Sequence, residues 1–110
     1  MEGLVKGDVV ITRFPYSDFS QLKLRPALVL AVLPGNDLIL CEITTKPVRN
    51  QYVIPVNNTD FMRGGLSQDS NIRPDKIATS ERQLIRYKVG RMKPEKVEQV
   101  VRKIVEIIGQ

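Results

Sequence analysis

Short β-prone segments separated by turn residues fill most of the chain, and one helical pattern follows them at the C-terminus. Pro94 suits the first position of a helix, and Gly109 suits the residue that ends it. Between them, apolar residues recur at the spacing of a single helix face. This stripe consists of Val97, Val100, Val101, Ile104, Val105 and Ile108. A helix must cover its apolar face, so we expect it to pack on the strands or on a partner chain.

The strands are predicted from runs of β-branched and apolar residues that end at turn residues. They span residues 7–14, 25–33, 38–45, 51–56, 70–79 and 87–92, with turns at 34–37 and 57–60. Segments 15–23 and 61–68 are predicted to be loops, and 80–85 a single helical turn. Pro74 confines its strand to an edge or an irregular path. Five or more short strands and one closing helix predict a mainly β (α+β) fold, either a small barrel or a strongly bent sheet.

A length of 110 residues and a hydrophobic fraction of 42% are typical of one domain, which we expect to span residues 1–110. Cys41 is the one cysteine, so no internal disulfide can form and a reducing compartment is favoured. The N-terminus lacks the pattern of a signal peptide, and the longest apolar run, 26–34, is too short to span a membrane. We therefore expect a cytoplasmic protein that does not enter the membrane.

The chain has no histidine, and this excludes several kinds of chemistry. A Ser-His-Asp or Cys-His catalytic group cannot form within one chain, and neither can a His-ligated zinc site. Catalysis would have to depend on Arg, Lys, Asp, Glu, Ser, Thr or Tyr, and we expect no metal and no cofactor. The net charge of +5 is compatible with a polyanionic partner, but also with solubility alone.

Arginine residues mark two candidate sites. Arg25 opens an apolar predicted strand directly after a polar loop, where it could hold a phosphate through two parallel hydrogen bonds. The alternative is a structural ion pair with Asp18 or Asp75. Arg73 lies two residues before Asp75, so in an extended chain their side chains share a face. The two residues could form a phosphate clamp beside a general base, or simply an ion pair that holds a loop.

A third candidate site lies at the end of the strand predicted at 38–45. Alternation places Ile39, Cys41 and Ile43 on one face, which is apolar and expected to join the core. Glu42 and Thr44 share the other face and could present a carboxylate and a hydroxyl side by side. The alternative is that threonine is present as a good strand former and that the glutamate is solvated.

Several segments, in this order, resemble the MazF/PemK family of toxins from type II toxin–antitoxin systems. The most specific are Gly7-Asp8-Val9-Val10, Arg25-Pro26-Ala27-Leu28-Val29, Ile43-Thr44 and Ile72-Arg73-Pro74-Asp75-Lys76. The resemblance extends from about Lys6 to Ile108. It implies an SH3-like β-barrel with a C-terminal helix, a homodimer, and a cognate antitoxin whose disordered tail covers the RNA site. It also implies a metal-independent endoribonuclease that cuts single-stranded RNA, usually mRNA, at short sequence motifs.

The resemblance also implies which residues act. Arg25 of the Arg-Pro motif and Thr44 of the Ile-Thr motif would be catalytic, and PemK-type members add Arg73 and Asp75. Candidate RNA-binding residues are Ser17, Gln21, Lys23, Glu42, Thr45, Lys46 and Arg49. Many family members carry a Gly-Ser-Glu-Gln loop before the Arg-Pro motif, and PemK-type proteins can place a histidine there. Here residues 16–21 are Tyr-Ser-Asp-Phe-Ser-Gln, so the resemblance does not fix the target sequence.

An enzyme of this kind can use the ribose 2′-hydroxyl of RNA as its nucleophile, which suits a chain without histidine. We expect Arg25 to stabilise the phosphoryl charge, Thr44 to orient a phosphate oxygen, Asp75 to act as base, and Arg73 to act as acid or second clamp. The products would be a 2′,3′-cyclic phosphate and a 5′-hydroxyl. Two alternatives remain open: a binding toxin that resembles the gyrase poison CcdB, and a catalytically silent SH3-like nucleic-acid-binding module.

Overall fold

A computed structural model describes residues 3–13 and 23–110. In this part of the chain the strands are β1 (Asp8–Arg13), β2 (Leu24–Val32), β3 (Asp37–Thr44), β4 (Ile54–Val56), β5 (Phe61–Gly64), β6 (Ser70–Glu81) and β7 (Ile85–Met92). Two short 3-10 helices, η1 (Asn58–Asp60) and η2 (Arg82–Leu84), and one α-helix, α1 (Pro94–Ile108), complete it. Among the described residues, no helix is both long and apolar enough to cross a membrane.

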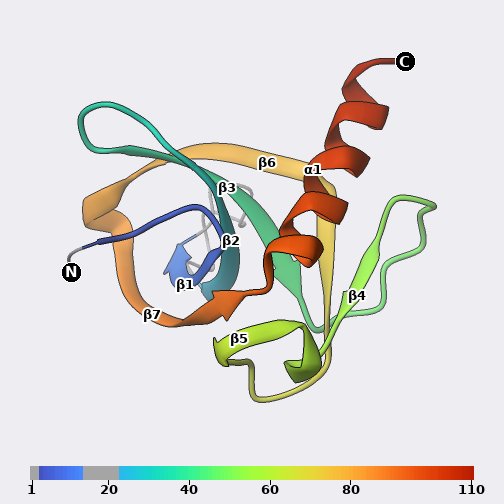
Figure 1. Cartoon of the computed structure of the whole chain (residues 1–110), viewed down its shortest axis with the longest axis horizontal. Helices are drawn as coiled ribbons and strands as arrows, with labels where there is room; N and C mark the ends of the chain where they lie inside the picture. The colour runs from blue at the N-terminus through green and yellow to red at the C-terminus, as the bar shows by residue number, and fades with distance from the viewer. Residues whose placement is uncertain (1–2, 14–22) are drawn as a thin grey trace.

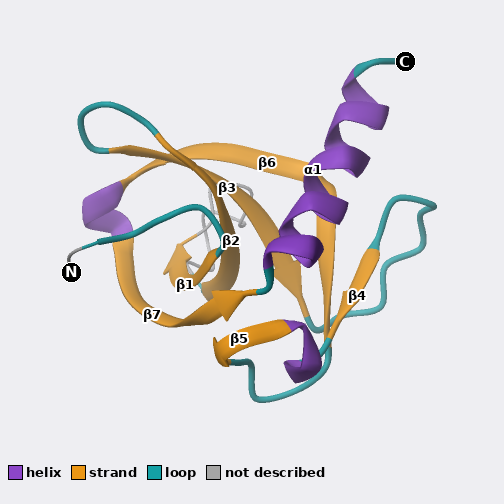
Figure 2. Ribbon diagram, viewed as in Figure 1, coloured by secondary structure: helices purple, strands orange, loops and turns teal. Residues whose placement is uncertain are grey.

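The strands form one sheet in the order β4-β6-β3-β2-β1-β7-β5, and every neighbouring pair is antiparallel. The sheet curls into a half-barrel, and α1 lies across it (Figure 1). Figure 2 shows that strands dominate the molecule and that the longest helix stands at its C-terminus. The predicted mainly β fold with one C-terminal helix is thus confirmed.

Two predicted elements differ from the structure. Residues 51–53 do not belong to a strand, because β4 begins only at Ile54. The segment 61–68 was expected to be a loop, but its first four residues form β5, which pairs with β7. The sequence did not predict this strand, because the Gly64-Gly65 pair is typical of a turn. Gly64 has φ of +64°, and a Cβ there would collide with the carbonyl oxygen of Val89. Glycine is therefore required by a close approach of two strands rather than by a turn alone.

The path of β6 around Pro74 is irregular, as the sequence predicts. Cys41 of β3 pairs with Ile77 of β6, but the next residue, Glu42, pairs with Arg73. Residues 74–76 therefore have no partner in β3 and form a bulge. On its other side, β6 pairs with β4 only over residues 70–72. Pro74 therefore pairs with neither β3 nor β4. Because no hydrogen bond of the sheet would use an N–H at this position, the lack of one in proline costs nothing here.

Each face of the sheet carries apolar residues. The larger cluster joins Val9, Leu28, Cys41, Ile43 and Ile72 of the sheet to Val97, Val100 and Ile104 of α1. A smaller cluster on the other side includes Val10, Ala27, Val29, Leu38 and Leu40. The predicted separation of Cys41 and Ile43 from Glu42 is confirmed, because both apolar residues are fully buried in the larger cluster.

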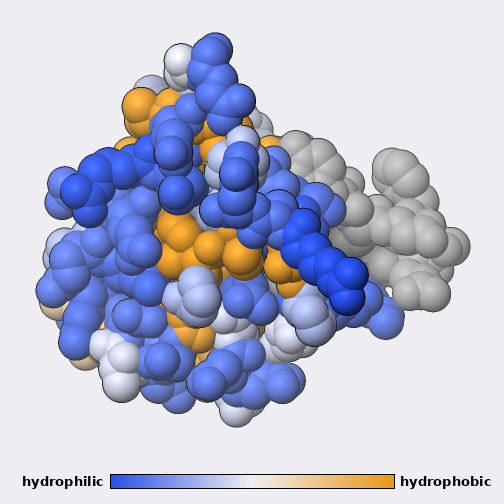
Figure 3. Space-filling view, turned by 90° about the vertical axis from the view of Figure 1, so that its right-hand side faces the viewer, coloured by the Kyte–Doolittle hydropathy of each residue, from blue (hydrophilic) through white to orange (hydrophobic). Residues whose placement is uncertain are grey.

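The sheet covers the apolar stripe of α1 as far as Ile104, but not the residues at the C-terminal end of the stripe. Val97 and Val100 are buried, whereas Val105 and Ile108 are 62% and 70% exposed. Figure 1 shows the reason, since the C-terminal end of α1 extends beyond the sheet. The side of the molecule on which α1 and β4 lie also carries an apolar patch framed by hydrophilic side chains (Figure 3). Packing on the strands therefore accounts for only part of the predicted stripe.

A buried carboxylate joins the start of β1 to β7. Asp8 is fully buried, and its Oδ2 accepts the backbone N–H of Val5 at 2.8 Å. Its Oδ1 accepts Nε of Arg91 at 2.9 Å and lies 3.6 Å from Nζ of Lys88. A buried charge is tolerated only when partners of this kind replace the lost water. Asp8 thus ties the N-terminal segment and β7 to the start of β1.

Replacing Asp8 with alanine should lower the free energy of unfolding by about 3 kcal/mol, because Arg91 would keep its charge without a partner. Chemical denaturation measures the difference. Asp37→Ala, at an exposed residue of β3, is the matched control and should change stability by less than about 0.5 kcal/mol. Equal effects of the two substitutions would contradict the role given to Asp8.

Candidate functional site

The register of β2, β3 and β6 brings the predicted site residues to one face of the sheet. Ala27 of β2 pairs with Glu42 of β3, and Glu42 pairs with Arg73 of β6. Paired residues of neighbouring strands project to the same face, as do residues two apart on one strand. Arg25 lies two residues from Ala27, and Thr44 lies two residues from Glu42. Both therefore share the face of Glu42 and Arg73, and we call these four polar residues the polar row. Segments that are far apart in the sequence thus meet at one end of the sheet.

Glu42 and Thr44 are both buried, so the alternative that Glu42 is solvated is wrong, whereas Thr44 does lie within β3 as a strand former would. Glu42 is 8% exposed and Thr44 6%. Oε2 of Glu42 is buried without a hydrogen-bond partner among the described residues and lies 4.0 Å from Nζ of Lys76. Oγ1 of Thr44 accepts the N–H of Lys46 at 3.1 Å. That contact uses a lone pair of the hydroxyl, so its proton can be donated elsewhere.

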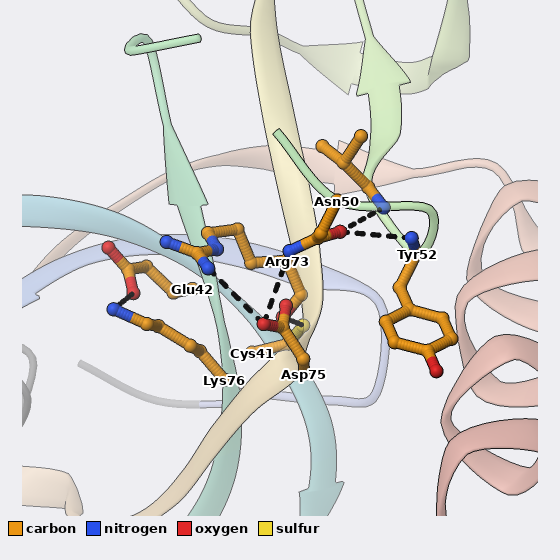
Figure 4. A network of polar contacts seen from close by, with 8 residues as sticks. Cys41, Glu42, Asn50, Tyr52, Arg73, Asp75 and Lys76 are labelled. Atoms are coloured by element: carbon orange, nitrogen blue, oxygen red, sulfur yellow. Dashed lines mark hydrogen bonds and ion pairs between the residues drawn. The ribbon is translucent and has the colours of Figure 1, made fainter. Parts of the chain in front are cut away.

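Arg73 and Asp75 form the contact that alternation predicts. NH2 of Arg73 lies 3.2 Å from Oδ2 of Asp75, and the two side chains are 22% and 27% exposed. The same carboxylate oxygen accepts Nδ2 of Asn50 at 3.3 Å (Figure 4). Nε of Arg73 is buried and makes no hydrogen bond within the described part of the chain. Asp75 therefore pairs with Arg73, and no ion pair joins it to Arg25 within the described residues.

The remaining predicted residues lie close to the polar row in sequence. Lys23 is exposed immediately before β2, and Thr45, Lys46 and Arg49 are exposed in the segment that follows β3. Arg25 itself is half-buried. Ser17, Gln21 and the proposed ion-pair partner Asp18 lie outside the described residues.

Two amide side chains that the sequence analysis did not single out contribute to the site. Nδ2 of Asn71 donates to the carbonyl oxygen of Lys46 at 3.2 Å, and Asn50 contacts Asp75. These bonds join the segment after β3 to β6 on the side of the candidate site. Asn50 lies in a loop, where an asparagine predicts only a turn, and Asn71 lies within β6. Neither position carried a sequence signal for a contact that long-range pairing creates.

Cys41 lies beneath the polar row and is not a candidate nucleophile. Its Sγ is buried and donates to the carbonyl oxygen of Arg73 at 3.1 Å. Burial, together with the negative charges of Asp75 and Glu42, raises the pKa of the thiol to about 12. The thiolate is the reactive form of cysteine, so this residue stays protonated and acts as a core side chain.

Comparison with solved structures shows the class of protein that has this fold. An "endoribonuclease in complex with its cognate antitoxin from Mycobacterial species" superposes with a TM-score of 0.76 at 14% identity, covering 97% of this chain and 96% of that one. The Mycobacterium tuberculosis toxin MazF-mt6 gives 0.73 at 18% identity, covering 93% and 96%. MazF in the MazE–MazF structure from Deinococcus radiodurans gives 0.72 at 17% identity, covering 97% and 96%. The half-barrel with its C-terminal helix is therefore a MazF-like fold.

The family itself follows from the sequence. The model of the PemK-like, MazF-like toxins of type II toxin–antitoxin systems matches residues 5–108. The chain belongs to this family, as the resemblance of its motifs implied. No curated protein sequence matches the chain significantly.

The buried thiol predicts a pH dependence of stability. The unfolded thiol ionises near pH 9, whereas the folded one stays protonated up to about pH 12. The folded state therefore binds more protons in this range, and its free energy of unfolding should fall as the pH rises, by up to about 1.4 kcal/mol per pH unit. Below pH 9 this contribution is fully present.

Denaturant unfolding of the wild type and Cys41→Ala between pH 7.5 and about pH 10.5 measures the effect. Lysine and tyrosine titrate in both proteins, so their difference isolates the thiol. Wild-type stability should fall more steeply above pH 9. Parallel curves would show that Cys41 does not resist ionisation.

Proposed function

We propose that this protein is a metal-independent endoribonuclease toxin that cleaves single-stranded mRNA at a short sequence motif. The observation that carries the proposal is the strand register that gathers Arg25, Glu42, Thr44 and Arg73 on one face, with Asp75 held against Arg73. Cleavage of RNA by such a site would need no protein nucleophile, because the 2′-hydroxyl of the ribose supplies one. Two of the similar solved structures are endoribonucleases from Mycobacterial species, which supports the same activity here.

In the proposed reaction, the 2′-oxygen forms a bond to the adjacent phosphorus, and the bond from phosphorus to the 5′-oxygen breaks. Asp75 takes the proton of the 2′-hydroxyl, and Arg73 beside it holds the phosphate or delivers the proton to the leaving oxygen. Arg25 stabilises the charge on the phosphoryl oxygens, and the Thr44 hydroxyl donates to one of them. The products are a 2′,3′-cyclic phosphate and a 5′-hydroxyl end.

Residues around the row are suited to the rest of the RNA strand. Exposed cations close to the row in sequence, Lys23, Lys46 and Arg49, would meet backbone phosphates. A pocket of about 380 Å³ is lined by Pro26, Thr45 and the exposed ring of Tyr87. Pro26 and Thr45 alternate with Arg25 and Thr44 along the chain, so this pocket opens on the other face of the sheet and is not assigned to the reaction.

The protein is proposed to act in the cytoplasm as a homodimer that a cognate antitoxin inhibits. The exposed apolar end of α1, with Val105 and Ile108, offers a surface that a second chain could cover. Two of the similar structures are complexes, one of an endoribonuclease with its cognate antitoxin and one of MazE with MazF. An acidic, foldable antitoxin segment would compete with RNA for the cationic side of the site.

Arg25→Ala and Thr44→Ala should each reduce cleavage of a long single-stranded RNA by about 10²–10³-fold, because each removes a group that stabilises the transition state. The assay contains EDTA, and the cut ends are analysed for a cyclic phosphate and a 5′-hydroxyl. Arg102→Ala, an exposed cation on the polar face of α1, is the matched control and should cleave normally. A strict need for magnesium, or 5′-phosphate products, would refute the scheme.

The same assay separates the two alternative functions. A wild-type protein that arrests growth but cuts no RNA would favour a binding toxin that resembles CcdB. A protein that binds RNA, cuts nothing and does not arrest growth would favour a silent binding module. Cleavage that persists unchanged in Arg25→Ala would mean that the protein is an endoribonuclease whose active site lies elsewhere.

Binding of RNA should weaken steeply as salt rises, because each phosphate contact releases counterions. A non-cleavable RNA with 2′-O-methyl groups measures affinity alone. Each of Lys46→Ala and Arg49→Ala should make the slope of log affinity against log salt shallower by about 0.7. Arg102→Ala should leave the slope unchanged. A wild-type slope near zero would contradict a cationic RNA-binding surface.

A further inference from the structure

Asn50 makes more contacts than an ordinary turn residue. Its Oδ1 accepts two backbone N–H groups, of Tyr52 at 2.9 Å and of Val53 at 3.0 Å. Its Nδ2 donates to Oδ2 of Asp75 at 3.3 Å. Figure 4 shows this amide between the turn on one side and the Arg73–Asp75 pair on the other. The side chain thus spans two elements that are separate in sequence.

Chemistry fixes the orientation of this amide. Only the oxygen of the side chain can accept the two backbone N–H groups, so the NH2 group must face the carboxylate. Rotating the amide by 180° would place donors against donors and an oxygen against the negative charge of Asp75. The turn at 50–53 therefore dictates that Asn50 presents an N–H to Asp75.

The geometry fixes the carboxylate of Asp75 as well. Its Oδ2 accepts hydrogen bonds from both Arg73 and Asn50, while Oδ1 accepts no hydrogen bond within the described part of the chain. Two donors from different directions restrict the rotation of the carboxylate more than one donor can. Oδ1 is thereby left as the oxygen that a substrate hydroxyl can approach.

We propose that Asn50 is a positioning residue for the reaction, which holds Asp75 beside Arg73 so that Oδ1 can take the proton of the 2′-hydroxyl. This inference rests on the proposed function. Asn50 does not touch the reacting atoms, and it acts through Asp75. The turn makes it effective, because an amide locked by its own backbone contacts loses little entropy when it binds the carboxylate.

Two substitutions separate the turn from the contact. In Asn50→Asp, a carboxylate oxygen can still accept the N–H groups of Tyr52 and Val53, but the donor to Asp75 is lost and a like charge replaces it. In Asn50→Ala, both the turn and the contact are lost. Asn57→Asp is the matched control, because Asn57 also accepts a backbone N–H, from Thr59 at 2.9 Å, and caps η1.

Cleavage by Asn50→Asp should be slower than wild type by about 10- to 100-fold in kcat, with little change in KM, because a misplaced group costs rate rather than binding. The acid limb of its pH–rate profile should move to higher pH, because the new charge favours protonation of Asp75. Within the described part of the chain, the other charged or titratable groups around Asp75 are its partner Arg73, Cys41 and the Glu42–Lys76 pair (Figure 4), and none is altered. Asn57→Asp should match the wild type in both measurements.

A double-mutant cycle tests whether Asn50 acts through Asp75. If it does, Asn50→Ala should have almost no further effect on the cleavage rate in the Asp75→Asn background. Effects that multiply independently would overturn the proposal, and so would an Asn50→Asp protein with wild-type kcat and pH profile.

A readout that does not depend on activity separates this inference from the proposed function. The carboxyl carbon resonance of Asp75, followed by NMR, should titrate at higher pH in Asn50→Asp than in the wild type. If the resonance moves but the wild type cuts no RNA, the proposed function fails while the contact stands. If RNA is cut but neither the resonance nor the rate changes, the positioning role is wrong.

Discussion

The pairing of β3 with β6 is the constraint on which the site depends. The ladder runs regularly from Asp37 to Cys41 and then shifts, so that Glu42 pairs with Arg73 while residues 74–76 bulge. Without the shift, Glu42 would face Lys76, and Arg73 would lie beyond the end of β3. The bulge moves the Arg73–Asp75 pair next to the row that already contains Arg25 and Thr44. Bulges commonly re-aim side chains in this way, and here the proline in the bulge needs no ladder hydrogen bond.

The same pairing concentrates negative charge above an apolar layer. Glu42 and Asp75 both lie close enough to raise the pKa of Cys41, while Arg73 and Lys76 lie beside the carboxylates. The carboxylates therefore have cationic neighbours, but Glu42 Oε2 and Arg73 Nε find no hydrogen-bond partner in residues 3–13 and 23–110. Buried groups without partners cost stability, and such strain is found where binding or catalysis uses it. In the proposed enzyme, these two atoms lie beside the scissile phosphate.

Sequence patterns predicted the elements better than the contacts. Alternation along β3 separated the core residues Cys41 and Ile43 from Glu42 and Thr44, and the helical stripe located α1. The patterns failed where tertiary contacts decide. Residues 61–64 form a strand because Gly64 can approach β7 closely, and Glu42 is buried although a glutamate at a strand end is usually solvated. Asn50 carried no signal, because its partner Asp75 lies 25 residues away in the chain.

The sequence by itself determined the strand and helix segments, the family, and the short-range pair of Arg73 and Asp75, because these depend on periodicity and on spacing within one strand. Only the tertiary structure decided which strands are neighbours, where the ladder shifts, and how much of α1 the sheet covers. The physical reason is that a register is selected by the packing of whole faces. A shift of one residue exchanges the buried and exposed sides of a strand. The site is a product of that selection, since its residues come from three strands and the segment after β3.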